Sequence, residues 1–220
     1  MTAQIDHLVV VAQTLEQGAV WCEATLGVAP GPGGRHASMG THNLLLSIAS
    51  AAFDRCYLEI IAIDPAAAPP GRPRWFGMDT PRLRAAVRDR PRLVHAVART
   101  TAIEPLRRGL MNLGLDPGAP IAAHRDTAHG RLSWRITVRD DGETECAGAL
   151  PTLIEWQGPH PSDRLAASPV SLAALALRGV PAPAGELLAL QRVDIDAGTG
   201  PPLRAALDTP LGRRVLESSP

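Results

Sequence analysis

The strongest constraint on the fold is a pattern of apolar segments that occurs twice along the chain. In each half, one apolar run encloses a single histidine, His7 in the first and His95 in the second. A later apolar run in each half encloses a single glutamate, Glu59 and then Glu155. Buried ionisable groups are costly unless they are paired, hydrogen-bonded or bound to metal. The repetition therefore predicts that two similar units bring two histidines and two glutamates to one shared site.

The segments between these positions predict the same order of elements, βαβββ, in both halves. Alternation of apolar residues indicates strands, and apolar residues at helical spacing before Gly27 and Gly114 indicate one helix in each half. In the first strand, alternation places Ile5 and His7 on one face. The glycine-rich residues 31–34 predict a turn. The expected strands are 5–11, 35–39, 43–49 and 56–63 in the first half, and 92–99, 121–125, 131–139 and 150–157 in the second.

The spacing of the repeat tests whether the marked residues correspond. His7 and His95 are 88 positions apart, whereas Glu59 and Glu155 are 96 apart, which we interpret as a longer loop in the second unit. The glycines that end the two helices are only 87 apart. Because a shift of one residue turns a strand side chain to the opposite face, the role of His95 depends on this register.

The last fifty residues predict a third, shortened βαβββ-like unit that lacks the marked His and Glu. We expect modules at 1–66 and 91–163, a linker with a helix at 67–90, and the third unit at 168–220. An unpaired module has an apolar edge or face to cover. It would pair with its counterpart in a homodimer or cap the cup of its own chain, and we favour the homodimer.

Composition excludes several classes of protein. The net charge is zero and no basic stripe is present, which argues against a nucleic-acid partner. No apolar run reaches the roughly 18 residues that span a membrane, and no signal peptide precedes the first strand. Three scattered cysteines indicate reduced thiols and a cytoplasmic protein. All 22 cationic residues are arginine, so the chain has no lysine for a Schiff base or a phosphate-binding loop.

Several segments together resemble the glyoxalase-like branch of the vicinal oxygen chelate superfamily. The resemblance covers residues 4–163 and implies an α+β fold in which paired βαβββ modules form an open, cupped sheet. The segments that carry it are Ile5–Val10, Gly33–His36, Gly40–Asn43, Tyr57–Glu59, Arg125, Gly130, Trp134–Arg135, Leu150–Trp156 and His160–Pro161.

The resemblance implies that His7, Glu59, His95 and Glu155 hold one divalent metal ion in the cup. Imidazole and carboxylate ligands suit Zn, Ni, Mn, Fe or Co. The ion would act as a Lewis acid and Glu155 as the catalytic base. The implied activity is that of a lyase or isomerase that acts on a small oxygenated substrate through an enediolate-type intermediate.

Polar residues in the matching segments predict the wall of the cup that binds the substrate. They are Arg35, His36, Thr41, Asn43, Arg125 and Trp134. Arg35 or Arg125 would clamp an anionic substrate. The alternative is that the polar groups satisfy loop backbone and that Trp134 fills the core.

Two other functions fit the same cup. A binding protein of the drug-sequestering type would use it without catalysis. A ring-cleaving dioxygenase would hold Fe(II) with two His and one Glu.

Overall fold

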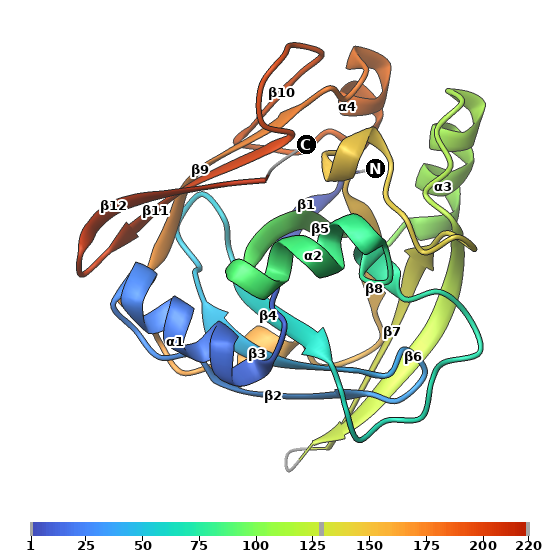
Figure 1. Ribbon diagram of the computed structural model, residues 1–220. Coiled ribbons are helices and arrows are strands. Elements are labelled where there is room, and N and C mark those ends of the chain that lie inside the picture. Colours follow the sequence, from blue (N-terminus) through green and yellow to red (C-terminus); the bar gives the residue numbers. More distant parts are fainter. Residues whose placement is uncertain (1, 128–129, 219–220) are drawn as a thin grey trace.

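The computed structural model describes residues 2–127 and 130–218, which form an eight-stranded sheet and a four-stranded sheet (Figure 1). The first module contains β1 (Gln4–Val11), α1 (Leu15–Leu26), β2 (Gly31–His36), β3 (Thr41–Ser47) and β4 (Tyr57–Ile63). The second module contains β5 (Arg92–Arg99), α3 (Ile103–Asn112), β6 (Ala119–Thr127), β7 (Gly130–Val138) and β8 (Thr152–Trp156).

The large sheet joins the two modules and curls into a cup. Its strand order is β2-β3-β4-β1-β5-β8-β7-β6, with the antiparallel pair β1 and β5 at the junction. In both modules the first strand runs parallel to the last, as β1 does to β4 and β5 to β8. The edge strands β2 and β6 also come into contact. These features confirm the predicted α+β fold with paired βαβββ modules.

The register at the junction settles the correspondence between the modules. His7 lies opposite Val97 and Val9 lies opposite His95, so His7 and His95 occupy equivalent positions. Both histidines are on the face that carries Val9 and Val97, which line the inside of the cup. The register of β1 and β5 therefore follows the spacing of 88 and turns His95 toward the inside of the cup.

A β-bulge interrupts β1 beside His7. Ile5 pairs with Ala98 and His7 with Val97, so Asp6 has no partner of its own across the strand pair. The extra residue reverses the alternation of side chains. As a result, Ile5 packs in the core on the outer face of the sheet, and the prediction that it shares a face with His7 is wrong.

The second strand also differs from the prediction. Residues 31–34 do not form a turn, because β2 begins at Gly31 and pairs with β3 across an irregularity between Pro32 and Arg35. A Cβ on Gly33 would lie only 2.1 Å from Asn43 Oδ1. The glycine thus allows the strand backbone to approach the Asn43 side chain.

The segment between the modules fills part of the cup. It forms the short 3-10 turn η1 (Trp75–Gly77) and α2 (Pro81–Asp89), and α2 is the helix expected within the linker at 67–90. Trp75 and Phe76 of η1 are buried in the core inside the cup. Phe76 has a φ of 59°, a left-handed conformation that is uncommon for a bulky residue.

The C-terminal unit covers the outer face of the large sheet (Figure 1). It contains β9 (Ser171–Arg178), α4 (Ala182–Leu188), β10 (Val193–Asp196), β11 (Leu203–Thr209) and β12 (Gly212–Glu217), in the predicted βαβββ order. Its pairing differs from that of the modules, because β9 runs parallel to β10 and antiparallel to β11. Its apolar side chains share one core with α1, α3 and the outer face of the sheet, so the unit does not cap the cup. The homodimer stays a prediction.

No helix among the described residues is both long enough and apolar enough to cross a membrane.

Candidate active site

The bulged residue Asp6 is the centre of a buried polar cluster. Its carboxylate lies 2.6 Å from His7 Nδ1 and 2.8 Å from His160 Nε2, and it accepts a hydrogen bond of 3.0 Å from Trp156 Nε1. Burial alone raises the pKa of Asp6, but the hydrogen bonds and charges of His160 and His7 hold it well below its usual range. Asp6 is therefore an ionised carboxylate in the interior.

The hydrogen bonds around Asp6 determine which nitrogen of each histidine carries a proton. His160 Nδ1 accepts the backbone N–H of Ser162 at 3.1 Å, so His160 Nε2 carries the proton donated to Asp6. An ionised carboxylate only accepts, so His7 Nδ1 must also donate to it. His7 Nε2 is left to face the inside of the cup, with the ring stacked on Tyr57 at 4.6 Å.

Glu59 lies beside His7, on the neighbouring strand β4. Its Oε2 lies 3.5 Å from His7 Nε2, and its Oε1 accepts a hydrogen bond of 2.5 Å from Asn43 Nδ2. The glutamate is only 6% exposed. A carboxylate and an imidazole lone pair that face each other in the interior repel unless a proton or a ligand group lies between them. His7 and Glu59 thus form a pair suited to sharing one proton.

The Asn43 side chain orients Glu59, and all four of its hydrogen-bonding positions are used. Its Oδ1 accepts from the backbone N–H of Gly34 at 2.7 Å and from Arg125 Nη1 at 3.2 Å. Its Nδ2 donates to Glu59 and to His36 Nε2, the latter at 3.4 Å. This network fixes the amide so that its NH₂ group points at the Glu59 carboxylate.

His36 supports this arrangement as a neutral histidine. Burial, opposed by the Glu59 charge and assisted by the Arg125 charge, lowers the pKa of His36 from 6.5 to about 4. Its Nδ1 lies 3.0 Å from Thr41 Oγ1, and Trp75 packs edge-on against the ring at 5.0 Å. Its Nε2 is therefore available to accept the hydrogen bond from Asn43.

Most of the residues predicted to bind substrate meet around this cluster. His36, Asn43, Arg125 and Trp134 line an inner cavity of about 30 Å³ that His7 and Glu59 also line. This volume holds no more than two or three water-sized groups. Thr41 contacts His36 but does not line the cavity. Arg35 lies outside it, with Nε 3.4 Å from Asp64 Oδ2 and a side chain that is 69% exposed.

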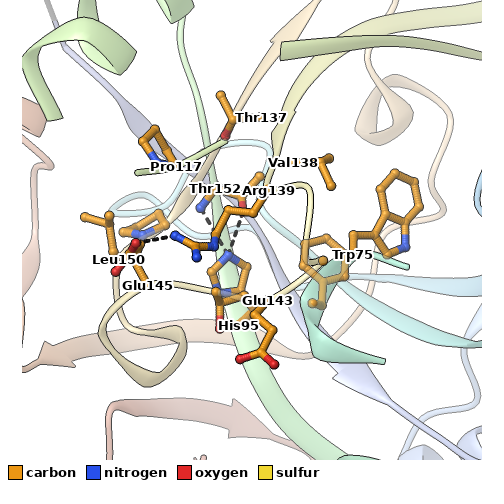
Figure 2. Close-up of a pocket in the computed structure, with 14 residues that line it drawn as sticks. Trp75, His95, Pro117, Thr137, Val138, Arg139, Glu143, Glu145, Leu150 and Thr152 are labelled. Atoms are coloured by element: carbon orange, nitrogen blue, oxygen red, sulfur yellow. Dashed lines mark hydrogen bonds and ion pairs between the residues drawn. The ribbon is translucent and has the colours of Figure 1, made fainter. Parts of the chain in front are cut away.

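His95 faces the cup, but both of its nitrogens are occupied within its own module. Figure 2 shows the contact between His95 and Thr152. Its Nε2 accepts the backbone N–H of Thr152 at 3.1 Å, so its Nδ1 donates to the Gly148 carbonyl at 2.8 Å. Burial lowers the pKa of His95 to about 4. Phe76 packs against its ring at 5.4 Å. No lone pair of His95 is left to bind a metal ion in this arrangement.

Glu155 lies on the outer face of the sheet, away from the other three predicted ligands. It accepts a hydrogen bond of 3.2 Å from Arg135, which also pairs with Glu104 of α3. In the first module Val9 lies beside Glu59, and the equivalent Val97 of the second module lies beside Thr152. Thr152 therefore occupies the place that corresponds to Glu59. The predicted equivalence of Glu155 and Glu59 is therefore wrong by three residues. Because side chains alternate along a strand, an odd shift places Glu155 on the face opposite to that of Thr152.

The donor set consequently does not fit the predicted metal site. Only His7 Nε2 and Glu59 Oε2 of the four predicted ligands converge, whereas catalytic zinc sites use three protein ligands. Within residues 2–127 and 130–218, no group of three or more His, Cys, Asp or Glu side chains is arranged to hold an ion. Neither the four-ligand site nor a triad of two His and one Glu for Fe(II) is assembled.

Sequence reasoning missed Asp6, His160, Trp156 and Tyr57, although each lies in a segment that carries the family resemblance. The available signal was the adjacent pair Asp6-His7, since two ionisable side chains in succession within an apolar strand require either exposure or a bulge.

Together, the fold and the cluster define a protein with two βαβββ modules whose shared cup holds a buried His–Glu pair in the first module. Residues 5–190 match the family model described as "Glyoxalase-like domain". The chain belongs to this family, which confirms the resemblance seen in the sequence.

Solved structures support the fold at low sequence identity. A hypothetical protein from Staphylococcus aureus is similar over 99% of this chain and 86% of its own, with a TM-score of 0.61 and 14% identity. This likeness shows the fold alone. Methylmalonyl-CoA epimerase from Mycobacterium tuberculosis matches over 70% of this chain and 88% of its own, with a TM-score of 0.38 and 13% identity, which is too distant to carry an argument. Comparison with curated proteins finds no match.

Proposed function

We propose that this protein catalyses proton transfer at a carbon next to a carbonyl group of a small oxygenated molecule. The reaction is of the isomerase or lyase type and passes through an enolate or enediolate. The observation that carries the proposal is the line of Asp6, His7 and Glu59, with contacts of 2.6 Å and 3.5 Å. A buried carboxylate that orients a histidine toward a second acid–base group is a recurrent arrangement for general acid–base catalysis.

The residues divide the chemistry between them. His7 Nε2 takes the proton from the substrate carbon, so that the C–H bond breaks, an N–H bond forms and the electron pair moves onto the carbonyl oxygen. The Asp6 carboxylate stabilises the resulting imidazolium, as the buried aspartate does in catalytic triads. The Arg125 guanidinium, which lines the same cavity, stabilises the negative oxygen.

The intermediate collapses when a proton returns from His7 or from Glu59. Return to the same carbon on its other face inverts the centre. Return to the neighbouring carbon, with transfer of the hydroxyl proton to the former carbonyl oxygen, moves the carbonyl group. Asn43 holds Glu59 in position for this step with a hydrogen bond of 2.5 Å. Because the donor set does not fit the metal site implied by the family, protein groups carry out every proton transfer.

The test is exchange of substrate hydrogen with D₂O, followed by proton NMR over a panel of α-hydroxy ketones and 2-oxo acids. We expect Glu59→Gln and His7→Gln to reduce the exchange rate by about 100-fold or more. Glu155→Gln is the matched control, because this glutamate lies on the outer face and should leave the rate unchanged. Equal rates in the wild type and in Glu59→Gln would refute the assignment, as would loss of exchange in Glu155→Gln alone.

A binding protein that uses the same cup without catalysis is the second candidate. The observation that favours it is Thr152 in the place of a second carboxylate, so that the second half of the cup offers only His95, whose two nitrogens are both hydrogen-bonded. Saturable binding of panel compounds with no exchange by the wild type would favour this function over the first.

A further inference from the structure

A second cavity adjoins the inner one and has a different chemical character. Its volume is about 290 Å³, close to the lower end of the range for small-molecule sites. It shares Leu45, Arg125 and Pro161 with the inner cavity that contains His7 and Glu59. The two cavities therefore meet at these residues, and a molecule in the outer cavity can reach toward the His7–Glu59 pair.

The walls of the outer cavity are mostly apolar and rigid. Proline and leucine side chains supply them, namely Pro32, Leu45, Leu132, Pro159, Pro161 and Leu165. Such a lining favours a compact aliphatic body and costs little conformational entropy, since proline side chains lose none on burial.

Three arginines line the same cavity, and they differ in whether a carboxylate lies close enough to neutralise them. Arg131 is neutralised by Asp126, with Nε 2.8 Å from Oδ1. Arg125 and Arg164 have no carboxylate within 4.0 Å among residues 2–127 and 130–218. The one side-chain hydrogen bond that Arg125 makes in that part of the chain goes from Nη1 to Asn43 Oδ1, although a guanidinium has five N–H donors. Two cations with unused donors thus border an apolar cavity.

We propose that the outer cavity binds the anionic end of a substrate with a short apolar body, and that Arg125 and Arg164 hold that anion. Arginine suits this role because its planar fork matches the oxygens of carboxylates and phosphates. The assignment of the molecule as a substrate rests on the proposed function, whereas the binding of the anion does not. The substrate class is an aliphatic carboxylate or phosphate ester whose reactive carbon reaches the inner cavity.

The test uses hexanoate and hexyl phosphate as anionic probes and hexanamide as a neutral probe of the same length, with binding measured by calorimetry at low salt. We expect the better anion to bind about tenfold or more tightly than hexanamide, because charge-assisted hydrogen bonds from a guanidinium to an anion are stronger than those to a neutral amide. Comparison of the two anions distinguishes carboxylate from phosphate. Equal affinities for all three probes, or no binding of either anion, would overturn the proposal.

Substitutions of the arginines that line the cavity test which of them binds the anion. Arg164→Gln is expected to weaken binding of the better anion by about tenfold. Arg131→Gln is the matched control, because its partner Asp126 already neutralises it, and we expect less than a twofold change. An equal loss in both variants would mean that general charge, and not this site, attracts the probe. Thermal melts establish that each variant is folded.

The proposed function and this inference fail separately. Exchange of neutral α-hydroxy ketones without anion binding would overturn only the anion site. Anion binding that depends on Arg164, without any hydrogen exchange, would overturn the proposed reaction and leave the anion site standing.

Discussion

Asp6 and His7 are consecutive residues of one strand, yet their side chains meet at 2.6 Å in the interior. In a regular strand they would point to opposite faces of the sheet. The bulge opposite Ala98 and Val97 supplies the extra residue that turns both toward each other. The local irregularity of the strand is thus what builds the cluster.

Asp6→Asn tests the importance of this carboxylate for stability. An amide of the same shape lacks the charge and cannot accept from His7, His160 and Trp156 together. We expect a loss of about 2–3 kcal/mol in the free energy of unfolding by urea titration. Asp126→Asn, which breaks only an exposed ion pair, should leave the free energy of unfolding nearly unchanged. Equal effects of the two substitutions would contradict the buried network.

Gly33→Ala tests the link between β2 and Glu59. A Cβ at this position would lie 2.1 Å from Asn43 Oδ1, so Asn43 must move and its hydrogen bond to Glu59 must change. Overpacking of this kind costs about 1–3 kcal/mol in the free energy of unfolding. We expect this loss of stability together with slower exchange of substrate hydrogen with D₂O. Gly31→Ala is the control in the same strand, because its Cβ would be at an ordinary 3.6 Å from Leu45 O. A Gly33→Ala protein with wild-type melting temperature and exchange rate would exclude this link.

The element order and one half of the site could be predicted from the sequence. Alternating apolar residues and the repeated His and Glu positions were sufficient to place His7, Glu59 and the paired modules. Asp6 could not be placed, since alternation describes a regular strand and the bulge beside His7 breaks it. The same reversal explains the misplaced face of Ile5.

The prediction for the second half of the site is wrong for a different reason. It pairs Glu155 with Glu59 by residue type and attributes the difference in spacing to a longer loop. Loop length does not fix strand register, which here depends on the pairing of Val97 with Thr152. The burial of Trp75 and Phe76 inside the cup could not be predicted either, because a short turn that packs into the cup has no periodic pattern in the sequence.

Metal content provides a further test of the donor set. His7 and Glu59 are the two predicted ligands that converge, while His95 is bonded to Gly148 and Glu155 to Arg135. We expect protein incubated with Zn²⁺, Ni²⁺, Mn²⁺ or Fe²⁺ to retain well below one ion per chain after gel filtration, measured by mass spectrometry of the metals. The expectation would be contradicted if the wild type retained one ion per chain and His7→Ala did not. That result would show that the cup rearranges to complete a metal site.

The pH dependence of stability follows from the two buried neutral histidines. Burial lowers the pKa of His36 and of His95 from 6.5 to about 4, so the unfolded chain binds more protons between these values. Stability is therefore fully present above pH 6.5 and is lost as the pH falls toward 4, by up to about 3 kcal/mol for each histidine. His95→Gln should reduce the slope between pH 4.5 and 6 by about 1 kcal/mol per pH unit in urea titrations. His124→Gln, at an exposed position, is the control and should keep the wild-type slope. An unchanged slope in His95→Gln would show that this histidine is not held neutral in the folded protein.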